Sequence, residues 1–93
     1  MIQSFADRET ELIYNQEFSR RLPNTIQKVA LRKLMMIDNA KSLNDLRVPP
    51  SNRLEPLHGD REGQYSIRIN DQWRICFITN EGQFYNVEIV DYH

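Results

Sequence analysis

Residues 65–78, YSIRINDQWRICFI, decide the fold class of this chain because apolar and polar side chains alternate along them with a period of two. Such alternation is typical of β-strands that bury one face and expose the other. The polar stretch Asn70-Asp71-Gln72 interrupts the pattern, and its residue types favour a turn. The stretch is therefore predicted to form an antiparallel hairpin, with Trp73 on the buried face of its second strand.

The flanking segments extend the hairpin into a sheet. A second turn is expected at residues 80–83, and the alternation after it predicts a strand over residues 84–92. Residues 2–5 are predicted to form a short first strand, and residues 42–46 a helical turn capped by the serine that opens it. Residues 48–52 contain two successive prolines, which fix φ and remove backbone donors, so this segment must be a loop.

Two longer helices are predicted in the N-terminal half. The first runs from about residue 7 to residue 18, with Phe18 on its buried stripe. The second begins with Asn24 as its N-cap and ends near residue 40, with Lys33 on its polar face.

This order of elements predicts an α+β fold. Two N-terminal helices, plus a short third, pack on one face of a mainly antiparallel sheet of four to five strands. A chain of 93 residues forms one core, so residues 1–93 are expected to be a single domain. The other face of the sheet is expected to stay open and to carry Arg68 and Arg74, because side chains along a strand alternate between faces.

Charge and composition narrow the function only in part. The net charge of −1 argues weakly against a nucleic-acid-binding domain, since most such domains are basic. Residues 47–74, however, hold five arginines and no lysine, and the arginine fork suits phosphate. Alternatively, these arginines only cover a solvent-exposed face of the sheet and bind no phosphate. The single cysteine, Cys76, lies in an apolar run and is expected to be a buried thiol.

The sequence shows no sign of a signal peptide, a membrane span or a zinc site. The N-terminus lacks an apolar core of signal-peptide length, and no stretch approaches the roughly 20 apolar residues of a membrane span. The expected location is therefore cytoplasmic, with no membrane partner. Two histidines without cysteine neighbours give no recognisable zinc site, so no metal or cofactor is expected.

The C-terminal tripeptide Asp91-Tyr92-His93 is the most informative feature for function. Cleaving RNA through a ribose 2′-hydroxyl requires a base, an acid, and a cation or amide at the phosphate. Histidine titrates at about pH 6.5 and serves as either acid or base. Alternatively, these three residues are a frayed chain terminus without a function. His58, the only other histidine, either contacts a phosphate or caps its turn.

The second half of the chain also combines several motifs: LHGDREG at residues 57–63, SI at 66–67, NDQWRI at 70–75, Phe77, and VDYH at 90–93. Together they resemble the HigB-like branch of the RelE toxin superfamily. The resemblance implies a RelE-like fold and a ribosome-dependent endoribonuclease that cuts messenger RNA in the decoding site. It also implies a cognate helix-turn-helix antitoxin, which inhibits the toxin and binds operator DNA together with it.

The resemblance implies roles for particular residues. The family's closing acid, tyrosine and histidine, and its strand arginine, correspond to the expected catalytic residues. These are Asp91, Tyr92, His93 and Arg74. The expected RNA or phosphate contacts are Arg68, His58, Arg61 and Glu55. Glu55 stands where some relatives have histidine. Either Glu55 acts as a base, or His58 takes the place of that histidine, or the activity is weaker than in those relatives.

Two other functions stay open. Gyrase-poisoning relatives show that this scaffold can act on a protein target, in which case the C-terminal tripeptide would be catalytically idle. A non-catalytic module that has kept only antitoxin binding would fit Glu55 and the acidic balance of charge. The near-neutral charge also suggests a mild toxin.

Overall fold

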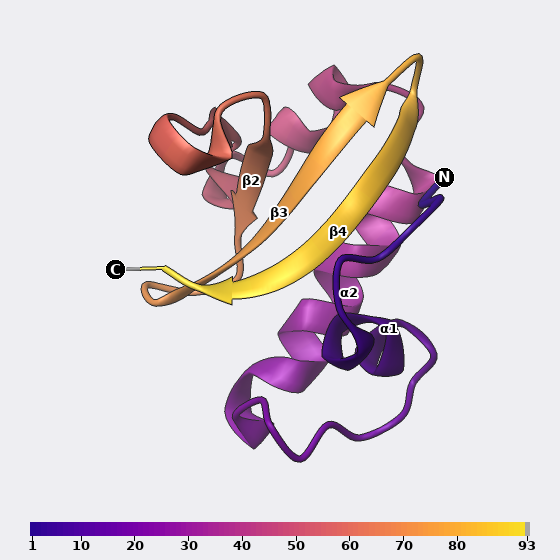
Figure 1. Cartoon of the computed structure of the whole chain (residues 1–93), viewed down its shortest axis with the longest axis vertical. Coiled ribbons are helices and arrows are strands. Elements are labelled where there is room, and N and C mark those ends of the chain that lie inside the picture. The colour runs from indigo at the N-terminus through magenta and orange to yellow at the C-terminus, as the bar shows by residue number, and fades with distance from the viewer. Residues whose placement is uncertain (93) are drawn as a thin grey trace.

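Figure 1 shows a curved sheet with the helices of the N-terminal half gathered on one of its faces. The computed structural model describes residues 1–92. Four antiparallel strands lie in the order β1-β2-β3-β4. The elements are α1 (Arg8–Tyr14), α2 (Asn24–Asn39), β1 (Glu55–Pro56), β2 (Tyr65–Arg68), β3 (Trp73–Asn80) and β4 (Gln83–Asp91). This architecture confirms the predicted α+β class. Within residues 1–92, no helix is long and apolar enough to cross a membrane.

The predicted hairpin is formed by β2 and β3. Ile67 lies opposite Ile75, and Arg68 lies opposite Arg74. In the connecting turn, the side chain of Asn70 accepts hydrogen bonds from the backbone N–H groups of Gln72 and Trp73, both at 2.8 Å, as asparagine does in turns. These contacts fix the register, and the register decides which side chains share a face.

The second hairpin joins β3 to β4 through Glu81 and Gly82. Both residues have positive φ, 51° and 79°, which is the requirement of a type I′ turn. Gly82 also lies against the loop after α2, since a Cβ atom there would stand 2.7 Å from the carbonyl oxygen of Lys41. Glycine therefore meets two requirements at this position, the turn conformation and the close approach.

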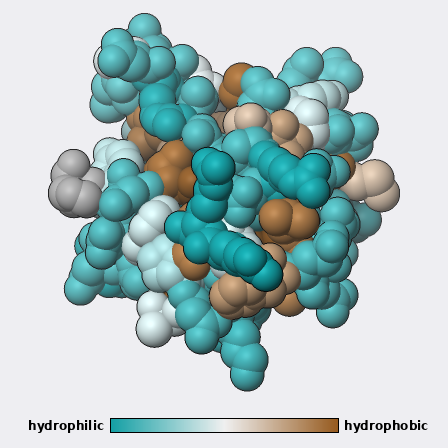
Figure 2. All heavy atoms as spheres, turned by 60° about the horizontal axis from the view of Figure 1, so that its bottom comes forward, coloured by the Kyte–Doolittle hydropathy of each residue, from teal (hydrophilic) through white to brown (hydrophobic). Residues whose placement is uncertain are grey.

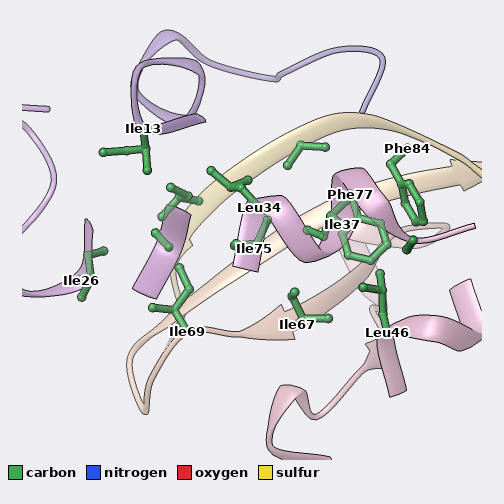
Figure 3. Packing of buried hydrophobic residues seen from close by; sticks show 14 residues of the cluster. Ile13, Ile26, Leu34, Ile37, Leu46, Ile67, Ile69, Ile75, Phe77 and Phe84 are labelled. Atoms are coloured by element: carbon green, nitrogen blue, oxygen red, sulfur yellow. The ribbon is translucent and has the colours of Figure 1, made fainter. Parts of the chain in front are cut away.

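The hydrophobic core lies between the sheet and α2. Figure 3 shows Ile67, Ile75 and Phe77 of the sheet facing Leu34 and Ile37 of the helix. All five side chains are completely removed from solvent. They come from alternate positions of the strands and from one stripe of the helix, as the two sequence periods predicted.

The N-terminal segment differs from the short strand predicted over residues 2–5. Ile2 and Phe5 make only isolated parallel bridges, to Phe84 and Val87 of β4. Asn86 lies between these two partners with φ of 52°, and β4 is irregular at this point. The segment therefore follows the edge of β4 without forming a continuous ladder.

The first helix is shorter than predicted, and Phe18 is not on its buried stripe. Helix α1 ends at Tyr14, and Gln16 adopts φ of 63°. The backbone N–H groups of Gln16 and Glu17 donate hydrogen bonds to carbonyl oxygens of the last helical turn. This is the Schellman motif, which terminates a helix. Phe18 then lies beyond the helix and is 62% exposed.

Two predictions about α2 were also wrong. Pro23 occupies the N-cap position and Asn24 is the first helical residue, without a side-chain cap. Lys33 is not on the solvated face but is 5% exposed, because the loop after α2 packs over it and Asn52 accepts a hydrogen bond from its ammonium group. The third, short helix is present at Leu43–Arg47, but the Ser42 side chain does not cap it.

Candidate active site

The face of the sheet opposite the helices carries polar side chains from neighbouring strands. Directly paired residues share a face, as do residues two apart in a strand. Ser66 lies opposite Glu55 of β1 and Cys76 of β3. Arg68 lies opposite Arg74. The predicted placement of the two arginines on the face away from the core is therefore confirmed.

This face is less open than predicted, because the loop before β2 covers part of it. The loop contains a short helical turn, η3 (Gly59–Arg61). From this turn, Arg61 forms a 3.1 Å ion pair with Glu88 of β4. Ser66 and Cys76 below are fully buried. Burial is the main cause that raises the pKa of the Cys76 thiol, and the predicted burial of this cysteine is confirmed.

Arg74 lies on this face near the start of β3, next to the β2–β3 turn, and is only 8% exposed. Its Nε donates to Ser66 Oγ at 2.8 Å, and its Nη2 donates to the backbone oxygen of Arg53 at 2.6 Å. Nη2 also lies 3.5 Å from Glu55 Oε1. These contacts fix the direction of the guanidinium, which is what a preorganised anion-stabilising group requires.

Glu55 places a carboxylate beside this guanidinium. Its side chain is about half exposed, at 45%, so it faces both Arg74 and solvent. His58, in contrast, is exposed at the residue before η3 and makes no side-chain cap to that turn. Of the two residues considered for a base, Glu55 is the one that the described contacts place beside Arg74.

The end of β4 brings the C-terminal residues to the same region. Gln72 of the β2–β3 turn donates to both carboxylate oxygens of Asp91 at 3.2 Å. Its backbone oxygen accepts from Tyr92 N at 2.6 Å. The Tyr92 ring lies 5.5 Å from the Arg74 guanidinium carbon, a cation–π distance. The prediction for His93 lies outside the described residues.

The remaining predicted phosphate contacts are engaged with acids. Arg68 forms an ion pair with Asp71 of the adjacent turn, and Arg61 is paired with Glu88. A phosphate at either arginine must compete with a carboxylate at 3.1 Å or closer. At Arg74 the carboxylate of Glu55 is farther away, at 3.5 Å, and the hydrogen bonds go to a hydroxyl and a carbonyl. Arg74, Glu55 and Tyr92 therefore form the tightest group among the predicted residues that the structure describes.

Sequence reasoning missed Asn52 and Lys33. Asn52 is fully buried next to the residue whose carbonyl binds Arg74, and Lys33 donates a hydrogen bond to its side chain. Burial lowers the pKa of Lys33, and Arg32 and Arg68 lower it further. No sequence pattern marks this pair, since a lysine on a helix and an asparagine after prolines are both ordinary surface residues.

A separate hollow of about 550 Å³ lies between the end of α1 and the start of α2, lined in part by Ile13, Phe18 and Leu31. It contains none of the predicted site residues. Figure 2, which views the molecule from below the orientation of Figure 1, shows a mainly hydrophilic surface with scattered hydrophobic patches.

Comparisons with known proteins show what this chain is similar to. The family described as "RelE-like toxin of type II toxin-antitoxin system HigB" matches residues 3–93. "Toxin HigB-1" of Vibrio cholerae serotype O1 is 40% identical over 83 residues, covering 88% of this chain and 87% of the relative. "Endoribonuclease HigB" of Proteus vulgaris is 32% identical over 93 residues, and each chain is covered completely.

Solved structures share the fold at much lower sequence identity. A crystal structure of a mutant of YafQ from E. coli superposes with a TM-score of 0.67 and 13% identity, and covers 98% of this chain and 91% of the other. The expected RelE-like arrangement of helices and sheet is confirmed by this likeness.

Proposed function

The chain belongs to the HigB-like toxin family of type II toxin-antitoxin systems, and from this premise we propose that it is an endoribonuclease that cleaves messenger RNA on the ribosome. The observation that carries the proposal is the rigid Arg74 guanidinium with Glu55 3.5 Å away and Tyr92 across its face. A fixed cation beside a carboxylate suits phosphoryl transfer, in which positive charge is needed where negative charge develops.

The proposed reaction uses the ribose 2′-hydroxyl as nucleophile. Glu55 takes the 2′ proton, the 2′-oxygen bonds to phosphorus, and Arg74 stabilises the charge on the phosphate. His93 gives a proton to the departing 5′-oxygen, so the products are a 2′,3′-cyclic phosphate and a 5′-hydroxyl. Asp91 orients His93 or shares its role, and Tyr92 positions the nucleotide. The nucleophile comes from the RNA, so we propose that no metal or cofactor is needed.

We propose that Arg68, Arg61 and His58 contact the RNA backbone around this centre. All three are more exposed than Arg74, and Arg68 and Arg61 already bind carboxylates. A face with so few uncommitted cations offers little affinity for a flexible strand by itself. The ribosome would supply the missing alignment by holding the messenger RNA in place.

A cleavage assay with matched substrates tests the function. Purified protein is added to programmed ribosomes that hold an all-ribose message, or the same message with one 2′-deoxynucleotide at the cut site, and to the same message without ribosomes. We expect cleavage only of the all-ribose message on ribosomes. Cleavage of the 2′-deoxy message would refute the mechanism, and equal cleavage of naked RNA would refute ribosome dependence.

The family also implies a protein partner. We propose a cognate helix-turn-helix antitoxin that inhibits this chain and brings it to operator DNA, with both proteins in the cytoplasm, where the ribosomes are. If the cleavage assay is negative, a gyrase supercoiling assay separates a toxin with a protein target from a module that only binds antitoxin.

A further inference from the structure

One of the groups that aim Arg74 is a backbone carbonyl in a loop. The oxygen of Arg53 accepts from Nη2 at 2.6 Å, a shorter contact than the 2.8 Å bond to Ser66. Arg53 has φ of 46°, which is sparsely populated for residues other than glycine. Such a conformation persists only where the surroundings hold it. The contacts that hold this loop therefore decide where the guanidinium points.

Asn52, the preceding residue, makes these contacts from a fully buried position. Its Oδ1 accepts a hydrogen bond from Lys33 Nζ. Its Nδ2 donates to the carbonyl oxygens of Leu46 at 3.1 Å and Val48 at 3.4 Å. One amide thus joins α2, the short helix after it and the proline loop, directly before the strained residue.

The polar character of this pair calls for an explanation beyond filling space. Burial makes the charged form of Lys33 costly, which is the first cause of its lowered pKa. Apolar side chains of similar volume would fill the site without that cost. What they would not supply is directional bonding, which selects a single loop conformation.

We propose that Asn52 and Lys33 are positioning residues for RNA cleavage, because together they hold the Arg53 carbonyl that aims Arg74 at the scissile phosphate. The inference rests on the proposed function of Arg74 and deepens it. Both residues act through Arg74 and not on the RNA, so they should affect the rate of the chemical step and leave ribosome binding unchanged.

Single-turnover cleavage by Asn52→Leu tests this. At saturating ribosomes we expect the rate constant to fall about 10- to 100-fold, as for a reacting group misplaced by about 1 Å, while the half-saturating ribosome concentration stays within about twofold. The matched control is Ser19→Ala, which removes another fully buried side chain that accepts backbone hydrogen bonds far from the site. It should keep the wild-type rate.

A double-mutant cycle separates positioning from general damage. In an Arg74→Ala background, Asn52→Leu should cost no further rate, because its effect passes through the missing guanidinium. Additive losses would overturn the positioning role while leaving the proposed function intact. Wild-type cleavage by Arg74→Ala alone would refute the role of Arg74 in the proposed function, and the inference with it.

A milder variant and its matched control keep the inference testable if Asn52→Leu does not fold. Lys33→Met should shift the Arg74 Nε–H resonance in the NMR spectrum and lower the rate about tenfold. Lys28→Met, the same change at an exposed lysine of α2, should leave that resonance unmoved and the rate within about threefold of wild type. An unmoved resonance and an unchanged rate in Lys33→Met would overturn the inference.

Discussion

Arg74 is buried in a small domain although arginine is rarely buried unless its donors are satisfied. Here the hydroxyl of Ser66 and the backbone oxygen of Arg53 accept from two of its five N–H donors, and Glu55 balances the charge from 3.5 Å. The side chain therefore needs little reorganisation when a phosphate arrives. Lysine could not replace Arg74 at this buried position, because its ammonium group is a point charge and lacks the planar fork of the guanidinium.

Glu55→Gln tests the proposed base. The amide keeps the size of the side chain but cannot take the 2′ proton, so we expect single-turnover cleavage on ribosomes to fall about 100- to 10,000-fold. Stability in urea should fall, because the buried Arg74 guanidinium loses its carboxylate partner, but the fold should persist, because the Glu55 side chain is itself 45% exposed. Glu55→Asp, which keeps the carboxylate, is the matched control and should retain more activity. Equal rates for Glu55→Gln and wild type would exclude Glu55 as the base.

His93→Ala tests the proposed acid. The core is built from residues between Ile13 and Ile89, so the fold and antitoxin binding should survive. Loss of an imidazole that transfers a proton lowers rates by about 100- to 10,000-fold, and growth inhibition in cells without antitoxin should disappear. Deletion of His93 should have the same effect. If both variants remain fully toxic, catalysis by the C-terminus is wrong and the protein-target alternative gains support.

At the scale of the elements, several boundaries depend on residues with positive φ. Gln16 closes α1 in a conformation that costs a non-glycine residue about 1–2 kcal/mol. Glu81 and Asn86 carry the same conformation at the hairpin turn and at the irregularity of β4. These residues lie away from Arg74, so they are places to change stability without changing the site.

Gln16→Gly should stabilise the fold. Glycine removes the steric cost of the left-handed conformation, and its extra entropy in the unfolded chain offsets part of the gain, so we expect a net gain of roughly 0.5–1 kcal/mol. Urea denaturation measures it, with the exposed Gln3→Gly as a control that should not stabilise. Cleavage should be unchanged, and a loss of stability in Gln16→Gly would contradict the assignment of the helix end.

The contact between α2 and the proline loop predicts a pH dependence. Between the lowered pKa of Lys33 and its ordinary value of 10.5, the unfolded chain binds more protons than the folded chain. Stability contributed by this group therefore rises with pH across that window. Urea denaturation at a series of pH values should show this rise in wild type relative to Lys33→Met. Parallel curves for the two proteins would mean that Lys33 titrates normally.

At the scale of the whole molecule, a net charge of −1 sets this chain apart from proteins that bind nucleic acid mainly by charge. If Arg74, Arg68 and Arg61 are the phosphate contacts, binding of single-stranded RNA should weaken with salt at a logarithmic slope of about −2. Fluorescence anisotropy with an uncleavable 2′-deoxy oligonucleotide measures the slope. A slope steeper than about −4 would require a cationic surface beyond these residues.

The sequence by itself determined the class of fold, because local periodicity sets which side chains of a strand or helix can be buried. The period of two predicted β2, β3 and β4 with both turns, and the opposite facing of Trp73 and Arg74. The resemblance of its motifs to HigB-like toxins was sufficient for the family. A catalytic role of the C-terminal tripeptide could be proposed from its residue types, and the roles of Asp91, Tyr92 and His93 stay predictions.

The tertiary structure alone decided which of these residues meet. Glu55 and Arg74 lie 19 positions apart in the chain, and strand pairing through Ser66 brings them to 3.5 Å. The burial of Lys33 and Asn52 also could not be predicted from the sequence. Helical spacing placed Lys33 on a polar face, and Lys33 is buried only because the proline loop folds over α2. Long-range contacts depend on how loops close, and no local pattern of residues encodes that closure.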